Sequence, residues 1–571
     1  MSFICKMLMF LQAICGLEYD FDNKKNEIMI CIRDPCVTSL SENIKECKNL
    51  KILILKNTKI SSLPASIAEL EDLEELVING CELQSFPLEI CSCSNLKVLD
   101  LNDNKIKAIP DKIKELKELK KLYLQSNKLK SLPKEVFDCL SLTELIACDN
   151  KITSLPEVKQ VIKLRLLDLS NNLLKNLPKS FVKLLNLDEL YVSKNSFKIF
   201  PAEIGELINL NYLDIGCNSI EVLPAEIGNL VNLKSLSLGR NQFKTLPTEI
   251  GKLKSLTDLR LERNRLQTIP AEIGEMVNLE YLLLNNNKLQ KLPYAINNLE
   301  KLKTLNLKNN QLRELPIELS GLTMLIELIL RNNKLRELPK TVGELKKLTE
   351  LDLSNNLLIE LPDEIGELEA LEILNLSNNE FWKLPETIGE LKKLTDFDLT
   401  NNLLIELSNK IGELEALENL NLSDNKLQKL PKIVGELKTL IELDLSSNLL
   451  IELPDEIGEL EALESLDLSK NQIKNLPIQI SELRKLKNLN ASQNGLEEVP
   501  YELGALGHLR VLDLSRNQLK HLPQSILWLQ SSLSKISLQG NEIVETSIIQ
   551  GTCGQKELRE CFGDYRICFS N

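Results

Sequence analysis

The prolines of this chain recur at a nearly constant spacing. They stand at positions 64, 87, 110, 133, 156, 178, 201, 224, 247, 270, 293, 316, 339, 362, 385, 431, 454, 477, 500 and 523, so every proline except Pro35 belongs to one series. The spacing is 23 residues, with one interval of 22, and Ser408 stands where the series omits a proline. Self-similarity of this length predicts a solenoid, in which each repeat packs only against its neighbours.

A typical repeat runs from Leu348 to Ala370 and reads LxxLxLxxNxLxxLPxxIGxLxx. The leucines of LxxLxL predict a short strand whose apolar side chains enter the core, and stacked strands form a parallel sheet. The asparagine six residues before each proline is expected to bond to backbone groups of neighbouring repeats. That position is asparagine in every repeat from Asn104 to Asn541, whereas Thr58, Cys81 and Pro35 replace it in the first ones. The proline then leads into a short helix on the opposite side.

The motif LPxxIGxL joined to LxxLxLxxNxL resembles the 23-residue class of leucine-rich repeats found in Ras-signalling scaffolds, cell-polarity scaffolds, plant Ras-group proteins and many bacterial and parasite proteins. The resemblance implies an α/β fold: a right-handed leucine-rich-repeat solenoid (horseshoe) with a concave parallel sheet and short convex helices. It assigns residues 17–49 to an N-terminal cap with a degenerate first repeat, residues 50–544 to about 22 repeats, and residues 545–571 to a C-terminal cap.

The amino terminus allows two interpretations. Residues 1–16 carry a cation at Lys6 and then a mostly apolar run from Met7 to Cys15, which is typical of a signal peptide. The alternative is an apolar first turn that covers the end of the solenoid.

The 14 cysteines also leave two alternatives. Disulfides could close both caps, as in secreted proteins; the candidates are Cys31, Cys36, Cys47, Cys553, Cys561 and Cys568. Otherwise the cysteines are reduced and serve as small core residues. Cys47, Cys93 and Cys139 occupy a position otherwise held by leucine, which favours the second alternative for these three.

Several classes of function are disfavoured by the sequence. The net charge of -13 argues against nucleic-acid binding, which relies on a basic surface. The sequence contains no run of 18 apolar residues, so it predicts no transmembrane helix. The sequence contains no glycine-rich phosphate loop, nucleophile elbow or metal-ligand cluster, so we expect neither an enzyme, nor a cofactor, nor a small-molecule substrate.

A partner is expected to bind on the concave face, at the positions twelve, ten, eight and seven residues before each proline. Large or charged side chains at these positions form our predicted site: Tyr123, Tyr191, Tyr212, Arg240, Arg260, Glu262, Arg263, Tyr281, Leu283, Lys308, Ile329 and Arg331. Arg240, Arg260, Arg263, Tyr281 and Leu283 should form one basic and aromatic patch on three neighbouring strands, which favours a protein partner with an acidic surface.

From about Leu338 onward the same positions carry small polar residues. This stretch also contains a 46-residue duplication, whose copies begin at Leu357, Leu403 and Leu449. We interpret this stretch as a spacer. Two functions remain open. One is a cytoplasmic protein-binding scaffold in Ras-type signal transduction, and the other is a secreted effector or surface-recognition protein that binds a host or extracellular partner.

Overall fold

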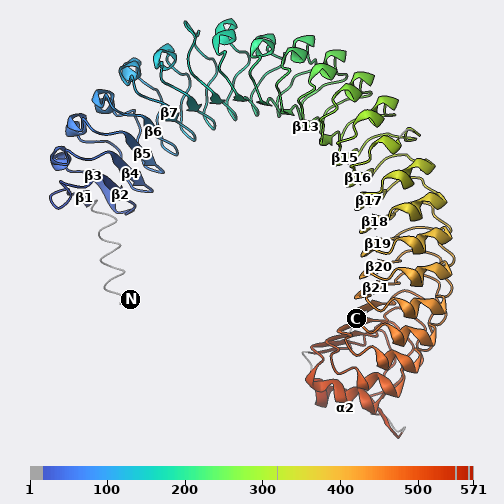
Figure 1. Cartoon of the computed structure of the whole chain (residues 1–571). Coiled ribbons are helices and arrows are strands. Elements are labelled where there is room, and N and C mark those ends of the chain that lie inside the picture. Colours follow the sequence, from blue (N-terminus) through green and yellow to red (C-terminus); the bar gives the residue numbers. More distant parts are fainter. Residues whose placement is uncertain (1–16, 318, 547–549, 564–565, 570–571) are drawn as a thin grey trace. The chain divides into compact units, whose positions relative to one another are not determined.

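The computed structural model describes residues 17–571 apart from 318, 547–549, 564–565 and 570–571. Residues 1–16, for which a signal peptide is one interpretation, lie outside the described residues. The chain forms two compact units, which we call unit 1 (to Tyr281) and unit 2 (from Leu282). Both are right-handed stacks of strand, loop and short helical turn, so the predicted α/β solenoid is confirmed. Within each unit the strands line the inner side of the arc and the turns its outer side (Figure 1).

In unit 1 the strands pair in parallel and almost always with the next repeat along the chain. The paired strands are β2 (Met29–Ile32), β4 (Ile52–Lys56), β5 (Glu75–Asn79), β6 (Val98–Asp100), β7 (Lys121–Tyr123), β8 (Glu144–Ile146), β9 (Leu166–Asp168), β10 (Glu189–Tyr191), β11 (Tyr212–Asp214), β12 (Ser235–Ser237) and β13 (Asp258–Arg260). A separate parallel pair, β1 (Leu17–Tyr19) with β3 (Val37–Leu40), precedes the regular repeats.

Strand β14 (Tyr281–Leu283) contains the division between the units. The strands of unit 2 also pair in parallel with the next one along the sheet: β15 (Thr304–Asn306), β16 (Glu327–Ile329), β17 (Glu350–Asp352), β18 (Ile373–Asn375), β19 (Asp396–Asp398), β20 (Asn419–Asn421), β21 (Glu442–Asp444), β22 (Ser465–Asp467), β23 (Asn488–Asn490), β24 (Val511–Asp513), β26 (Lys535–Ser537) and β28 (Ile567–Cys568). Near the carboxyl terminus, β25 (Leu522–Pro523) pairs antiparallel with β27 (Thr552–Cys553), and helix α2 (Gln555–Phe562) follows.

The helical turns of the repeats are 3-10 helices. In unit 1 they are η1 (Glu42–Glu46), η2 (Ala65–Glu69), η3 (Leu88–Ser92), η4 (Asp111–Glu115), η5 (Lys134–Asp138), η6 (Lys179–Lys183), η7 (Ala202–Glu206), η8 (Ala225–Asn229), η9 (Thr248–Lys252) and η10 (Ala271–Glu275). In unit 2 they are η11 (Tyr294–Asn298), η12 (Leu319–Gly321), η13 (Lys340–Glu344), η14 (Asp363–Glu367), η15 (Glu386–Glu390), η16 (Asn409–Glu413), η17 (Lys432–Glu436), η18 (Asp455–Glu459), η19 (Ile478–Glu482), η20 (Tyr501–Ala505) and η21 (Gln524–Ser531). The 22-residue repeat between β8 and β9 has no 3-10 helix.

Most turns begin one residue after the proline of their repeat. Pro362, for example, has φ -68 and ψ 151, and its fixed φ directs the chain into η14. Ser408 replaces a proline and caps η16 differently, because its hydroxyl accepts a hydrogen bond from the Lys410 amide at 3.1 Å. The glycine of the IGxL motif permits close stacking of the turns, since a Cβ on Gly366 would overlap the carbonyl oxygen of Thr387 in the next turn.

The asparagines of the series form a repeated set of hydrogen bonds inside the stack. Asn310 accepts a hydrogen bond from the Leu289 amide at 3.0 Å, and its Nδ2 donates to the carbonyls of Leu284 and Leu307, each at 3.0 Å. It therefore joins its own repeat to the preceding one. The same pattern runs from Asn104 to Asn264 in unit 1 and from Asn310 to Asn541 in unit 2, which confirms the role expected for this position.

Cys81 extends this ladder by one repeat beyond the first asparagine. Its Sγ lies 3.7 Å from the Leu55 carbonyl oxygen, 26 residues earlier, and 3.6 Å from the Asn79 carbonyl oxygen. Asn104 bonds to carbonyls at the same two separations. A thiol is a weaker donor than an amide, so the first repeats hold their backbone less firmly than the later ones.

We predict that Asn310→Ala destabilises unit 2 by about 3 kcal/mol, because it leaves one buried amide and two buried carbonyls without this partner. Urea unfolding followed by circular dichroism measures the change. Asn475→Ala is the matched control, since Asn475 is exposed two residues before its proline, and it should cost less than about 0.5 kcal/mol. Equal losses from the two variants would contradict the structural role of the ladder.

Candidate functional site

The sheet face of each unit presents the side chains that alternate with the buried leucines of the strands. In β11, Leu213 is 2% exposed, while Tyr212 and Asp214 on either side of it point outward. This alternation is the one expected for a strand with one face in the core. The sheet face is therefore a continuous surface within a unit, and it is formed by positions that the core does not constrain.

The structure places the predicted site residues on the sheet faces of both units. Unit 1 carries Tyr123, Tyr191, Tyr212, Arg240, Arg260, Glu262, Arg263 and Tyr281. Unit 2 carries Leu283, Lys308, Ile329 and Arg331. The division between the units falls within β14, so Tyr281 and Leu283, two residues apart on this strand, are counted in different units.

The four tyrosines differ in how much of the ring a partner could reach. Tyr123 and Tyr191 are half-buried, and their hydroxyls donate to Glu144 at 2.7 Å and to Glu189 at 2.9 Å. Burial and these carboxylates raise the pKa of both phenols. Tyr212 and Tyr281 are 40% and 42% exposed, so their rings are the more accessible anchors.

Asp258 changes the interpretation of the predicted basic patch. Arg260 donates through Nε and Nη2 to the Asp258 carboxylate, with its shortest N–O distance 2.9 Å, and this interaction raises the pKa of Arg260. Glu262 lies two residues further on, with one carboxylate oxygen buried and without a hydrogen bond. Its side chain lies over Gly239, where a Cβ would overlap the carboxylate. Asp258 therefore neutralises Arg260, one of the three arginines of the predicted patch, and leaves Arg240 and Arg263 as its exposed cations.

Arg240 and Arg263 keep exposed guanidinium groups for which the described part of the chain provides no ion pair. Both residues have φ of 56°, in the left-handed region that disfavours most side chains. In unit 2 the same position is usually asparagine, which tolerates this region, and Asn309 there donates to Asn286 at 2.8 Å. Arginine at a strained position is therefore a candidate for function rather than for stability.

The stretch that we interpret as a spacer has its side chains bonded to its own backbone. The Asp398 carboxylate accepts from the Thr400 amide at 2.9 Å and from the Thr400 hydroxyl at 2.6 Å. Asn375 and Asn421 accept from Ser377 and Ser423 in the same way. These groups already have partners, which supports the interpretation that this stretch offers little binding energy. On the same face, burial and the nearby carboxylates of Glu327 and Asp352 raise the pKa of Glu350.

All twelve cysteines among the described residues are free, including the six proposed for disulfide caps. Cys47, Cys93 and Cys139 are fully buried, and the thiols of Cys93 and Cys139 lie 3.5 and 3.4 Å from backbone carbonyls of the preceding repeat. Burial raises the pKa of Cys93 to about 11 and that of Cys139 to about 12. These cysteines are core residues, as their position in the repeat indicated.

Two further observations concern the described residues alone. They include no cluster of histidine, cysteine and carboxylate side chains suited to a metal ion. None of their helices has the length and apolar character needed to cross a bilayer.

A stack of parallel strands with an open sheet face defines a class of repeat proteins that bind along that face, and comparison with known proteins identifies the family. The family described as "Leucine-rich repeat region" matches residues 200–282, 271–357 and 351–443. Two further descriptions, "Leucine rich repeat" in different spellings, match residues 94–152 and 438–496, and residues 163–184 and 508–529. No curated protein matches the chain.

Solved structures agree with this assignment. The LRR protein LIC12759 of Leptospira interrogans is 38% identical, with 71% of this chain and 95% of that chain covered and a TM-score of 0.59. The plant peptide hormone receptor RGFR1 in complex with RGF2 is 28% identical over 95% and 92% of the two chains, with a TM-score of 0.66. YopM from Yersinia enterocolitica is 26% identical over 88% and 89%, with a TM-score of 0.54. The chain belongs to the leucine-rich-repeat family.

We predict that Arg240→Asn with Arg263→Asn raises the free energy of unfolding of unit 1 by roughly 0.5 to 1 kcal/mol per site, because asparagine fits the left-handed backbone better than arginine. Thermal and urea unfolding of the full chain measure the gain. Arg265→Asn is the control, since Arg265 is exposed nearby without a positive φ, and it should leave stability unchanged. A loss of stability in the double variant would show that the arginines hold the fold.

We also predict that iodoacetamide at pH 8 modifies Cys31 and Cys568, which are exposed, but leaves Cys93 and Cys139 unmodified in the native chain. A buried thiol with a pKa of 11 to 12 supplies almost no thiolate at this pH. Peptide mass spectrometry of the protein from its native source, with and without prior reduction, measures the pattern. Labelling of Cys31 and Cys568 only after reduction would demonstrate disulfides in the caps instead.

Proposed function

We propose that this chain is a non-catalytic recognition protein that binds a peptide or protein ligand on the sheet face of unit 1. The observation that carries the proposal is the contrast between the two sheet faces. Unit 1 exposes the rings of Tyr212 and Tyr281 and the cations of Arg240 and Arg263, whereas most of the unit 2 face carries small groups bonded to their own backbone. Tyrosine and arginine are the residues that most often dominate binding energy.

The partner that fits this face is a protein segment with acidic groups. Carboxylates would pair with Arg240 and Arg263, while the tyrosine rings offer apolar area with a polar edge. Structures of similar proteins support a polypeptide ligand: RGFR1 was solved in complex with RGF2, and the receptor kinase HAESA from Arabidopsis, 26% identical with a TM-score of 0.60, was solved in complex with the peptide hormone IDA.

We further propose that the repeats belong to the 23-residue LPxxIGxL class and that the chain acts as a scaffold in a reducing compartment, as in Ras-type signalling. The support is the set of free, buried cysteines, which serve the core as thiols. The secreted recognition protein is the second candidate, supported by the similarity to the receptor RGFR1. The iodoacetamide experiment distinguishes the two, because oxidised caps require an oxidising compartment.

We predict that Tyr212→Ala with Tyr281→Ala weakens binding of the partner by about 2 kcal/mol, roughly 30-fold, while folding is preserved because both rings are exposed. The partner is first captured from the native source on the immobilised wild-type chain and identified, and its affinity is then measured by calorimetric titration with each variant. Circular dichroism checks that the variants are folded.

The matched control is Asp398→Asn with Asp444→Asn on the sheet face of unit 2. Asparagine keeps the acceptor oxygen that Thr400 and Ser446 use, as Asn375 and Asn421 do in neighbouring repeats. Affinity should change by less than about 0.5 kcal/mol. A loss from the control pair alone would place the site on unit 2, and equal losses would mean that the ligand contacts both faces.

A further inference from the structure

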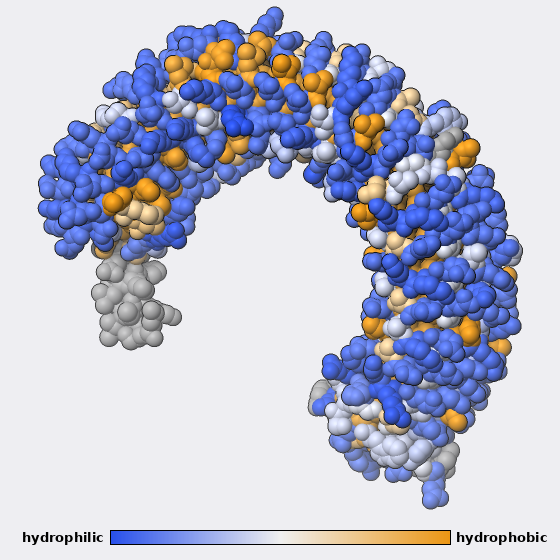
Figure 2. Space-filling view, in the orientation of Figure 1, coloured by the Kyte–Doolittle hydropathy of each residue, from blue (hydrophilic) through white to orange (hydrophobic). Residues whose placement is uncertain are grey.

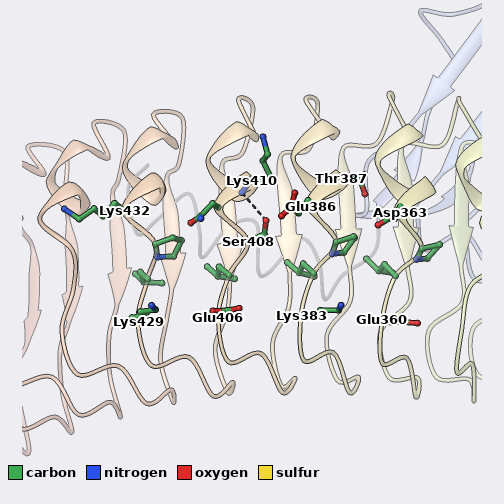
Figure 3. A pocket seen from close by; sticks show the side chains of 18 of the residues that line it. Glu360, Asp363, Lys383, Glu386, Thr387, Glu406, Ser408, Lys410, Lys429 and Lys432 are labelled. Atoms are coloured by element: carbon green, nitrogen blue, oxygen red, sulfur yellow. Dashed lines mark hydrogen bonds between the residues drawn. The ribbon is translucent and has the colours of Figure 1, made fainter.

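A second surface lies on the flank of unit 2, where each connecting segment runs from the strand to the turn. Two residues before each proline, or before Ser408, the side chains alternate in charge over five consecutive repeats. We call these five the flank row: Glu360, Lys383, Glu406, Lys429 and Glu452. All five are exposed, and in Figure 3 four of them, Glu360 to Lys429, lie along one side of a groove.

The groove beside the flank row has a volume of about 1460 Å³. Its floor is made by the leucine and proline of each repeat, such as Leu384 and Pro385, and the starts of the 3-10 turns form its other wall, as at Glu386 and Lys410 (Figure 3). The groove is thus a repeated feature, formed once per repeat by the same positions.

Charges on the neighbouring turns are largely paired within the chain, whereas those of the flank row are not. Lys346 reaches Glu367 of the next turn at 2.8 Å, and Lys438 reaches Glu459 at 3.0 Å. Among the described residues the flank row takes part in no ion pair, and the Nζ of Lys383 lies over the ring of Trp382, 4.6 Å from the ring centre. The alternating charges therefore remain available to a partner.

Apolar side chains accompany the flank row. The residue before each of its members is large and apolar in four of the five repeats, and these side chains are 45% to 58% exposed: Ile359, Trp382, Ile405 and Ile451. Apolar patches interrupt the hydrophilic surface of unit 2 in the space-filling view (Figure 2). Apolar side chains that alternate with free charges are the composition of a protein-binding surface rather than of an ordinary solvated one.

We propose that the flank of unit 2 is a self-association surface that docks against the same flank of a second copy of this chain. A partner for the flank row must present alternating charges at the spacing of one repeat, and a second copy does so by construction. In an antiparallel arrangement offset by one repeat, four of the five charges of each row face an opposite charge of the other copy, and one terminal glutamate of each row lies outside the contact. The same arrangement brings the two sets of apolar side chains together, and its two-fold symmetry closes the contact as a dimer.

The dimer should be weak and sensitive to salt. Five repeats stacked at about 4.8 Å give a contact roughly 24 Å long, at the low end of the size of stable interfaces. Its ion pairs are exposed at the rim, where salt screens them. We expect a dissociation constant on the order of 10 to 100 µM at low salt, weakening as salt is added.

Two charge variants of the full chain test the proposal by sedimentation velocity. Lys383→Glu with Lys429→Glu makes the row entirely acidic, and Glu360→Lys with Glu406→Lys and Glu452→Lys makes it entirely basic. Each variant alone should associate at least 10-fold more weakly than the wild type, because like charges then face each other. An equimolar mixture of the two should associate at least as tightly as the wild type, whatever the offset between the copies.

The control for the acidic variant is Lys117→Glu with Lys254→Glu, which makes the same change in net charge at exposed positions on the turns of unit 1 and should leave association unchanged. Circular dichroism confirms that every variant is folded. The proposal is overturned if the wild type stays monomeric at several hundred µM, if the two variants associate as the wild type does, or if mixing them restores nothing.

Discussion

The asparagine ladder is the interaction on which the rest of the structure depends. A strand of three residues cannot satisfy the backbone groups of the loop that follows it, and these groups are enclosed between repeats. One asparagine side chain per repeat forms hydrogen bonds with three of these backbone groups, as Asn310 does with Leu289, Leu284 and Leu307. Because the bonds cross from one repeat to the next, they set the register of the stack as well as its local turns.

The asparagines and leucines of each repeat stabilise the stack. A few other positions of each repeat do not contribute to the core and can therefore vary with function. On the sheet face of unit 1 these positions carry tyrosine and arginine, including Arg240 and Arg263 at left-handed positions where asparagine is better suited. From Asp352 onward in unit 2 they carry Asp or Asn with Ser or Thr two residues later, and these side chains bond to each other and stabilise the turn. The same framework thus carries exposed rings and cations in one unit and, over part of the other, side chains that bond to each other.

The flank row of unit 2 shows that a sequence duplication can produce an alternating pattern of charge on the surface as well as a spacer. Because the copied element is 46 residues long, it contains two repeats, and residues that differ between them alternate along the stack. Glu360, Lys383 and Glu406 are successive members of such a series. The core does not require these alternating charges, and the chain does not pair them internally. They are therefore complementary to the same row on a second copy of the chain.

The sequence by itself determined the fold, because the leucine, asparagine and proline positions recur every 23 residues and each has one physical role. It also determined which positions face outward, Tyr212 and Arg263 among them. Only the tertiary structure decided which of these side chains are free. Asp258 neutralises Arg260 along one strand, and Glu144 engages Tyr123 from the next repeat, 21 residues away. Such pairings depend on rotamers and on distances of a few ångströms between neighbouring repeats, which a periodic pattern of residue types does not encode.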